Sequence, residues 1–220
     1  MFSLVLAGWR TAAAQQPQGE ASDSVSAAAR PMFVPRVARL GVWFAGGWHA
    51  PISNYSPLPT DREVLVFGVE RRFHLLTRAG VELSTAPSLL PAVYTTGNRR
   101  QGNVVCRDAY SLDCEIGSAY SAYGVGLLPA SLRLQTSADQ RVGVSVSGDA
   151  GGALFNQRVP ATRATRFNFM ARFGADVVLR ATNATWLSVG YRHLHLSNGG
   201  TGDINPGIDT PLWSFGIAWR

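Results

Sequence analysis

The sequence contains no lysine, because every one of its 20 basic residues is arginine. Charged residues of both signs are also scarce, at 15% of the 220 residues, which is below their usual share in a soluble domain. Outside the N-terminus no apolar run reaches about 18 residues, so the sequence offers no transmembrane helix there. No basic cluster with interleaved aromatic residues occurs either, which argues against nucleic acid as a partner.

The arginines give the chain a formal net charge of +6 and allow three interpretations. Arginine binds phosphate groups bidentately, which suits a phosphorylated lipid. Arginine can instead pair with aspartate and glutamate inside a barrel. The third interpretation is the codon bias of a GC-rich genome against lysine. Composition alone does not decide among the three.

Cysteine is limited to Cys106 and Cys114, eight residues apart in the string CRDAYSLDC. A metal site needs more ligands close by, and the neighbouring sequence has none. In an exported protein this spacing predicts a local disulfide that closes a small loop and carries no chemistry. We therefore expect neither a metal nor a cofactor.

Glycine and aromatic residues are plentiful, with 23 glycines, ten phenylalanines and six tryptophans. The body of the chain repeatedly alternates large apolar residues with small or polar ones, which is typical of β-strands. Between Arg141 and Ser147, for example, three valines alternate with Gly143, Ser145 and Ser147. We count eight such segments, at about 37–48, 62–75, 82–96, 120–135, 141–152, 164–180, 185–198 and 210–220.

The eight segments predict an all-β fold, an eight-stranded antiparallel transmembrane barrel of the outer membrane. An even number of antiparallel strands can close without an exposed edge. The connections alternate between short ones, near 76–81, 136–140 and 181–184, and long ones, near 49–61, 97–119, 153–163 and 199–209. One face of the strands is large and apolar, which suits lipid outside and a narrow polar interior. The alternative is a soluble eight-stranded barrel or sandwich.

The N-terminal residues divide the chain into three predicted regions. Residues 1–14 read as a signal peptide, with a short apolar stretch followed by Ala12-Ala13-Ala14. Residues 15–35 are polar and rich in alanine and serine, which predicts a flexible lead-in. The barrel is expected to span residues 36–220.

The last thirty residues place three reactive side chains on one predicted face. His195 and Ser197 have the same parity as Val189, whose apolar face should contact lipid. Asp209 has the parity of Trp213 on the last strand, again the outward face. The three groups therefore converge on the outer wall, at the end of the barrel that carries the long connections.

Together these groups can perform acyl transfer. A serine hydroxyl is a weak nucleophile until a base removes its proton. A histidine can act as that base, and a carboxylate can orient the histidine. Asn198 and the backbone N–H of Gly199 can hold the oxyanion. Histidine, serine and asparagine are also ordinary residues at a strand end. Spacing alone therefore leaves catalysis open.

The residues His195-Leu196-Ser197-Asn198-Gly199, followed by Asn205-Pro206-Gly207 and Asp209, resemble the lipid A 3-O-deacylase family, or PagL-like proteins. Members of this family are eight-stranded outer-membrane barrels with a serine-esterase site on the outer wall. Their pattern places an acid fourteen residues beyond the histidine, as Asp209 is here. The family's usual acid is glutamate, which is one methylene longer.

The resemblance implies a lipid A 3-O-deacylase of the bacterial outer membrane, which hydrolyses the 3-O-linked hydroxyacyl ester. Ser197 would be the nucleophile, His195 the general base and Asp209 the orienting acid, with Asn198 and Gly199 at the oxyanion. The basic residues Arg99, Arg100 and Arg107 fall in a predicted outer loop and are candidates for the lipid phosphates.

The implied partners are lipid A or lipopolysaccharide and the surrounding outer-membrane lipid. A homodimer is one option for the oligomeric state. The main alternative is a non-catalytic outer-membrane barrel that acts as an adhesin, an envelope protein or a lipopolysaccharide-binding protein.

Overall fold

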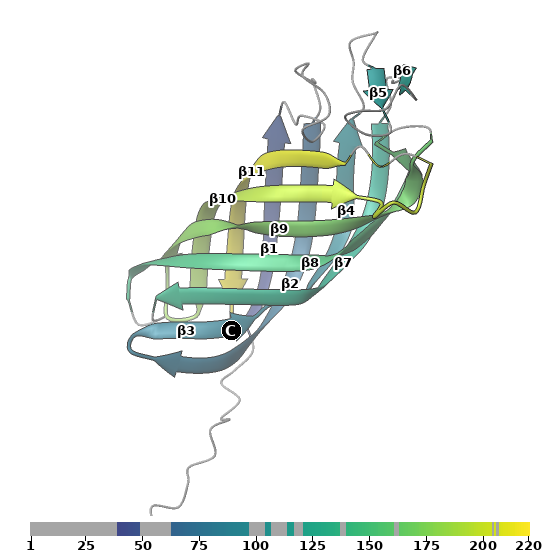
Figure 1. Cartoon of the computed structure of the whole chain (residues 1–220). Helices are drawn as coiled ribbons and strands as arrows, with labels where there is room; N and C mark the ends of the chain where they lie inside the picture. The colour runs from purple at the N-terminus through teal and green to yellow at the C-terminus, as the bar shows by residue number, and fades with distance from the viewer. Residues whose placement is uncertain are drawn as a thin grey trace, which may run out of the picture. The chain divides into compact units, whose positions relative to one another are not determined.

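The computed structural model describes residues 39–48, 63–96, 104–106, 114–116, 121–136, 140–160, 163–203, 205 and 207–220. The predicted signal peptide and lead-in lie outside these residues. Among the described residues, no helix is long and apolar enough to cross a membrane. The strands are β1 (Arg39–Trp48), β2 (Glu63–Arg78), β3 (Val81–Thr85), β4 (Ser88–Thr96), β5 (Val104–Cys106), β6 (Cys114–Ile116), β7 (Ser121–Thr136), β8 (Val142–Val159), β9 (Thr165–Arg180), β10 (Thr185–Ser197) and β11 (Ile208–Trp219) (Figure 1).

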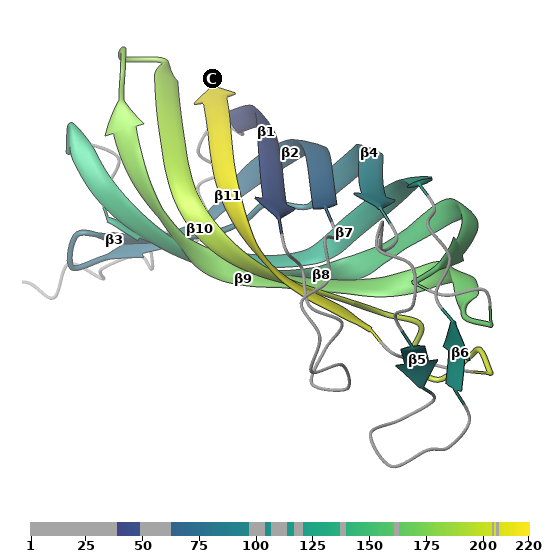
Figure 2. The same ribbon diagram turned by 90° about the horizontal axis from the view of Figure 1, so that it is seen from above.

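The main sheet closes into a ring of antiparallel strands. Its order runs from β1 through β11, β10, β9 and β8 to β7, and then through β3 and β4 to β2, which pairs again with β1. Figure 2 shows β1 beside both β11 and β2. Only Ala86 and Pro87 separate β3 from β4, and both strands pair with β2 and β7. These two strands are one interrupted wall segment, so the predicted eight-stranded barrel is confirmed.

The connections divide the barrel into two ends. We call the end with the short β2–β3, β7–β8 and β9–β10 connections the turn end, and the opposite end the loop end. The prediction of a long loop near 153–163 was wrong, because β8 continues to Val159. Gly151 and Gly152 interrupt the apolar alternation without ending the strand, and they lie near an irregularity in its pairing with β7.

The outer wall is apolar, as the alternation predicted. On β8 the side chains of Val142, Val144 and Val146 are exposed, whereas those of Ser145 and Ser147 are buried. The same alternation exposes phenylalanine, leucine, tyrosine or tryptophan side chains on the other long strands. A continuous apolar exterior of this kind is typical of a barrel surrounded by lipid.

The interior has two levels, and among the described residues the buried charged side chains gather in only one of them, toward the turn end, which we call the lower level. Near the loop end, buried apolar side chains such as Met170, Leu194, Leu196 and Leu212 fill the barrel. Toward the turn end, buried arginines pair with buried acids. The interior of an eight-stranded barrel is narrow enough for side chains to fill it. The prediction of a polar interior therefore holds most fully for the lower level, whereas the level near the loop end is mainly apolar.

In the lower level, several arginines form ion pairs with acids inside the barrel. Arg172 binds Asp149 with an Nη2–Oδ2 distance of 2.7 Å, and Arg192 binds Asp176 with an Nη2–Oδ2 distance of 2.6 Å. These side chains are almost completely buried. Of the three interpretations of the arginine content, pairing inside the barrel accounts for them.

Removing one acid from this network should destabilise the barrel. Asp176 accepts hydrogen bonds from Arg192, Ser145 and Ser214. The Asp176→Ala change would remove the closest acid from the buried guanidinium of Arg192, leaving it only the longer 3.6 Å contact with Asp149, and we expect it to lower the free energy of unfolding by about 3–5 kcal/mol. Urea unfolding in detergent measures the loss. The exposed Asp203→Ala variant is the matched control, and equal stability of the two variants would contradict the expectation.

Candidate active site

Strands β10 and β11 pair so that the predicted site residues meet at the loop end. Their register places His195 directly opposite Asp209. Along β10 the exposed or half-exposed residues alternate with buried ones, so His195 and Ser197 share the outer face with Val189. Asp209 lies on the outer face of β11 by the same alternation. The three side chains therefore belong to the lipid-facing wall.

A short hydrogen bond joins His195 and Asp209. The distance from Nδ1 of His195 to Oδ1 of Asp209 is 2.7 Å. Because an ionised carboxylate can only accept, this bond requires a proton on Nδ1. In the neutral ring Nε2 is then an acceptor, which is the form that a general base needs.

Ser197 ends β10, two residues beyond His195 on the same face, and lies opposite Phe169 of β9. Its side chain is half-buried. Among the described residues its hydroxyl makes no hydrogen bond with the His195 ring. The structure thus brings the histidine and the acid together and leaves the serine close by in the fold, without that contact.

The loop after Ser197 is held by asparagines. The Asn205 side-chain oxygen accepts a hydrogen bond from the Asn198 backbone N–H at 2.9 Å. Asn198 is fully buried on the inward face, and its own side-chain oxygen accepts from the Gly200 N–H at 2.9 Å. The structure therefore does not bring the Asn198 side chain to the outer face, where the oxyanion was expected.

Gly199 follows at the exposed corner of this loop, with a φ of 64°. A Cβ at this position would lie 2.8 Å from the ring of Phe169. Both the backbone conformation and the close approach therefore favour glycine. Gly199 is exposed beside the strand that carries Ser197.

His193 also contacts Asp209, which the sequence reasoning did not foresee. Its Nε2 lies 3.4 Å from Oδ1 of Asp209, the same oxygen that His195 binds. The His193 ring packs against Phe173, with the ring centroids 5.1 Å apart. The signal available in the sequence was its parity, which places His193 on the outer face with His195.

A shallow hollow of about 630 Å³ lies on the outer wall, on the β9 side of His193 and His195. Ala171 of β9 lies opposite His195, Ala150 of β8 lies opposite Ala171, and Ala130 of β7 lies opposite Ala150. We call the row of Ala171, Ala150 and Ala130 the alanine trough. Because neighbouring strands lie about 4.8 Å apart, the trough extends about 14 Å from His195 across the wall. Phe173 also lines the hollow.

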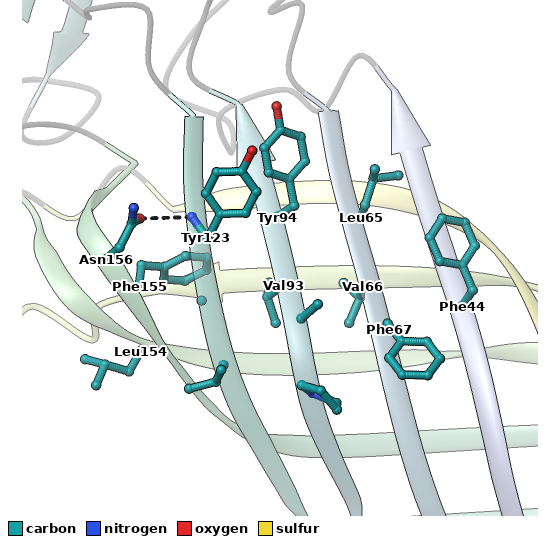
Figure 3. Close-up of a pocket in the computed structure, with 14 residues that line it drawn as sticks. Phe44, Leu65, Val66, Phe67, Val93, Tyr94, Tyr123, Leu154, Phe155 and Asn156 are labelled. Carbon is teal, nitrogen blue, oxygen red and sulfur yellow. Dashed lines mark hydrogen bonds between the residues drawn. The ribbon is translucent and has the colours of Figure 1, made fainter.

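A second hollow, of about 770 Å³, lies on the wall formed by β1, β2, β4, β7 and β8 (Figure 3). Phe44, Phe67, Tyr123 and Leu154 line it, and the side chain of Asn156 accepts a hydrogen bond from the Tyr123 backbone. The lining is almost entirely apolar and contains neither histidine nor acid. It suits hydrocarbon and offers no catalytic group.

Five predicted residues cannot be placed by their side chains. Arg99, Arg100 and Arg107 lie outside the described residues, so their contact with phosphate stays a prediction. The backbones of Cys106 and Cys114 lie directly opposite each other in the β5–β6 pair, but their side chains are outside the described part. The disulfide between them also stays a prediction.

Comparisons with known proteins agree with this architecture. The family model described as "Lipid A 3-O-deacylase (PagL)" matches residues 106–218. The crystal structure of the outer membrane enzyme PagL is similar with a TM-score of 0.55 and 17% sequence identity, covering 80% of this chain and 97% of that chain. The crystal structure of Neisserial surface protein A (NspA) has a TM-score of 0.45 and 11% identity, covering 84% and 99%. No curated protein matches the sequence.

Proposed function

Because this chain belongs to the lipid A 3-O-deacylase (PagL) family, we propose that it is a serine esterase that hydrolyses the 3-O-linked hydroxyacyl ester of lipid A. It is a β-barrel of the bacterial outer membrane. The proposal rests above all on the 2.7 Å hydrogen bond between His195 and Asp209 on the lipid-facing wall, with Ser197 on the same face. A site there meets its lipid substrate sideways, within the outer leaflet.

The proposed reaction begins with attack of the Ser197 hydroxyl on the ester carbonyl carbon. Nε2 of His195 takes the hydroxyl proton, and Asp209 stabilises the resulting imidazolium through Nδ1. The tetrahedral intermediate collapses as the bond to the sugar oxygen breaks, and that oxygen takes the proton from His195. Water, deprotonated by His195, then attacks the carbonyl carbon of the acyl ester on Ser197. The bond from that carbon to the serine oxygen breaks, the serine oxygen takes the proton back from His195, and a 3-hydroxy fatty acid is released.

Within this proposal the oxyanion roles of Asn198 and Gly199 differ. The backbone N–H of Gly199, at the exposed corner, is the donor we assign to the oxyanion. Asn198 is buried and holds the loop through Gly200, so we assign it a part in fixing the Gly199 backbone. The sequence-based expectation of a direct Asn198 side-chain contact is thereby replaced by an indirect one.

The alanine trough offers the acyl chain a place to lie. It begins beside His195, it faces lipid, and its small side chains leave a hollow among the larger side chains of the wall. Arg99, Arg100 and Arg107 remain our candidates for the lipid phosphates on the sugar side of the same ester. In this arrangement the headgroup lies toward the loops and the chain lies along the apolar wall.

Filling the trough should change which chains are released. We expect Ala150→Phe to lower kcat/KM for a long-chain hydroxyacyl ester about 10-fold, and to leave a short-chain ester nearly unaffected. Mass spectrometry of the released acids measures the preference. Ala92→Phe, in the second hollow, is the matched control, because Ala92 is also exposed on the outer wall. If only Ala92→Phe altered the preference, the acyl chain would have to bind in the second hollow and not in the alanine trough.

A non-catalytic outer-membrane barrel is the second candidate, as an adhesin, an envelope protein or a lipopolysaccharide-binding protein. One observation favours it, namely that the Ser197 hydroxyl makes no hydrogen bond with the His195 ring. The two candidates differ in the mass of lipid A recovered from cells that express the folded wild-type protein. Loss of one hydroxyacyl chain supports the esterase, whereas an unchanged mass supports the non-catalytic barrel.

A further inference from the structure

One oxygen of Asp209 faces two histidines. Oδ1 lies 2.7 Å from Nδ1 of His195 and 3.4 Å from Nε2 of His193. A carboxylate oxygen has two lone pairs, so it can accept from both rings at once. His195 lies directly across the strand pair from Asp209, whereas His193 reaches it diagonally from opposite Pro211.

Few polar groups hold the carboxylate of Asp209 in place. Its carboxylate leaves the backbone through a single methylene, and its side chain is about one quarter exposed, at 25%. Within the described part of the chain, the hydrogen-bond partners of its carboxylate are the two histidine rings. Without His193, rotation of the carboxylate would be limited by His195 alone.

His193 is itself held in place. Its ring packs on Phe173, with the centroids 5.1 Å apart and the planes inclined by 37°. Phe173 lies directly opposite His193 in the β9–β10 register. Because Nε2 points at the carboxylate, His193 is placed as a donor to Asp209 and not as a second base toward Ser197.

We propose that His193 is a positioning residue, whose Nε2–H holds Oδ1 of Asp209 where it binds Nδ1 of His195. The inference rests on the proposed esterase function. His193 does not touch the substrate in this role. Its contribution is to keep the catalytic histidine in the tautomer and orientation that leave Nε2 free to accept the serine proton.

Two substitutions test the N–H donor of His193 and its aromatic ring separately. His193→Phe keeps an aromatic ring against Phe173 and removes the donor, whereas His193→Gln keeps an N–H near the position of Nε2 and removes the ring. We expect kcat on a hydroxyacyl ester to fall about 10-fold in His193→Phe with KM unchanged. His193→Gln should retain most of the wild-type kcat.

Two further variants serve as controls. Tyr191→Phe changes the neighbouring outward residue on β10 and should leave both constants unchanged. In an Asp209→Glu background the carboxylate is shifted by one methylene from the position that Nε2 of His193 reaches, so His193→Phe should cost less there than in the wild type. This non-additivity is expected only if the two residues act through one contact. The heat-dependent gel shift of folded barrels confirms that each variant is folded.

A spectroscopic readout keeps this inference distinct from the proposed function. NMR of isotope-labelled histidine reports the Nδ1–H of His195 and its hydrogen bond to Asp209 whether or not the protein hydrolyses lipid. We expect the hydrogen-bonded signal to weaken in His193→Phe and to persist in His193→Gln. An unchanged signal and an unchanged kcat in folded His193→Phe would overturn the proposal. A wild type without activity but with the expected signal changes would overturn the esterase function alone.

Discussion

Replacing Ser197 with alanine is expected to abolish the release of 3-hydroxy fatty acid from lipid A while leaving the barrel folded. The change removes the oxygen that forms the acyl ester and leaves His195 and Asp209 in contact. Loss of a serine nucleophile typically lowers kcat by about 10³-fold or more. Ser197 is half-buried at the end of β10, outside the apolar core, so we expect its loss to change stability little. Mass spectrometry of lipid A from cells that express each variant measures the reaction.

Ser188→Ala is the matched control for this result. Ser188 lies on the same strand but has the inward parity, near Gly216 of β11. It should leave the lipid A mass pattern of the wild type unchanged. Deacylation by folded Ser197→Ala protein would exclude Ser197 as the nucleophile. In that case the esterase site would lie elsewhere, or another residue would activate water directly.

The walls of this barrel could be predicted because alternation is a local property. Val142, Val144 and Val146 revealed both a strand and its outer face without knowledge of any neighbour. The end of β8 at Val159 could not be predicted, because Gly151 and Gly152 break the alternation. There, pairing with β9 and β7 sustains the strand.

The sequence could predict the site as far as the parity of a residue determines which face of its strand the side chain lies on. Parity correctly assigned His195, Ser197 and Asp209 to one face, and it also implied an inward Asn198, which shares the parity of Leu194 and Leu196. What parity cannot give is the register between strands. The alanine trough arises because three pairings place small residues in one row, and those pairings are known only from the fold. The contact of His193 with Asp209 is likewise diagonal across two strands.

The second large effect is expected at Asp209. Asp209→Asn keeps the size of the side chain but removes the charge that stabilises the His195 imidazolium. It also puts an N–H where an acceptor is needed, so the wrong tautomer of His195 is favoured. An equivalent loss in a serine protease lowers kcat by about 10⁴-fold, and we expect a fall of at least about 10²-fold here because the pair is partly exposed. Steady-state kinetics on a defined hydroxyacyl ester measure it.

Asp209→Glu tests the same contact from the other side, because it keeps the charge and lengthens the side chain by one methylene. Asp209 lies directly opposite His195, and the present 2.7 Å bond shows that the shorter acid already reaches Nδ1. We therefore expect kcat of Asp209→Glu to stay within about 10-fold of the wild type. The matched control for Asp209→Asn is Asp203→Asn, which removes a charge from the adjoining loop without changing the partner of His195. If Asp209→Asn hydrolysed the ester as fast as the wild type, Asp209 would not be the orienting acid, and the role we assign to His193 would fall with it.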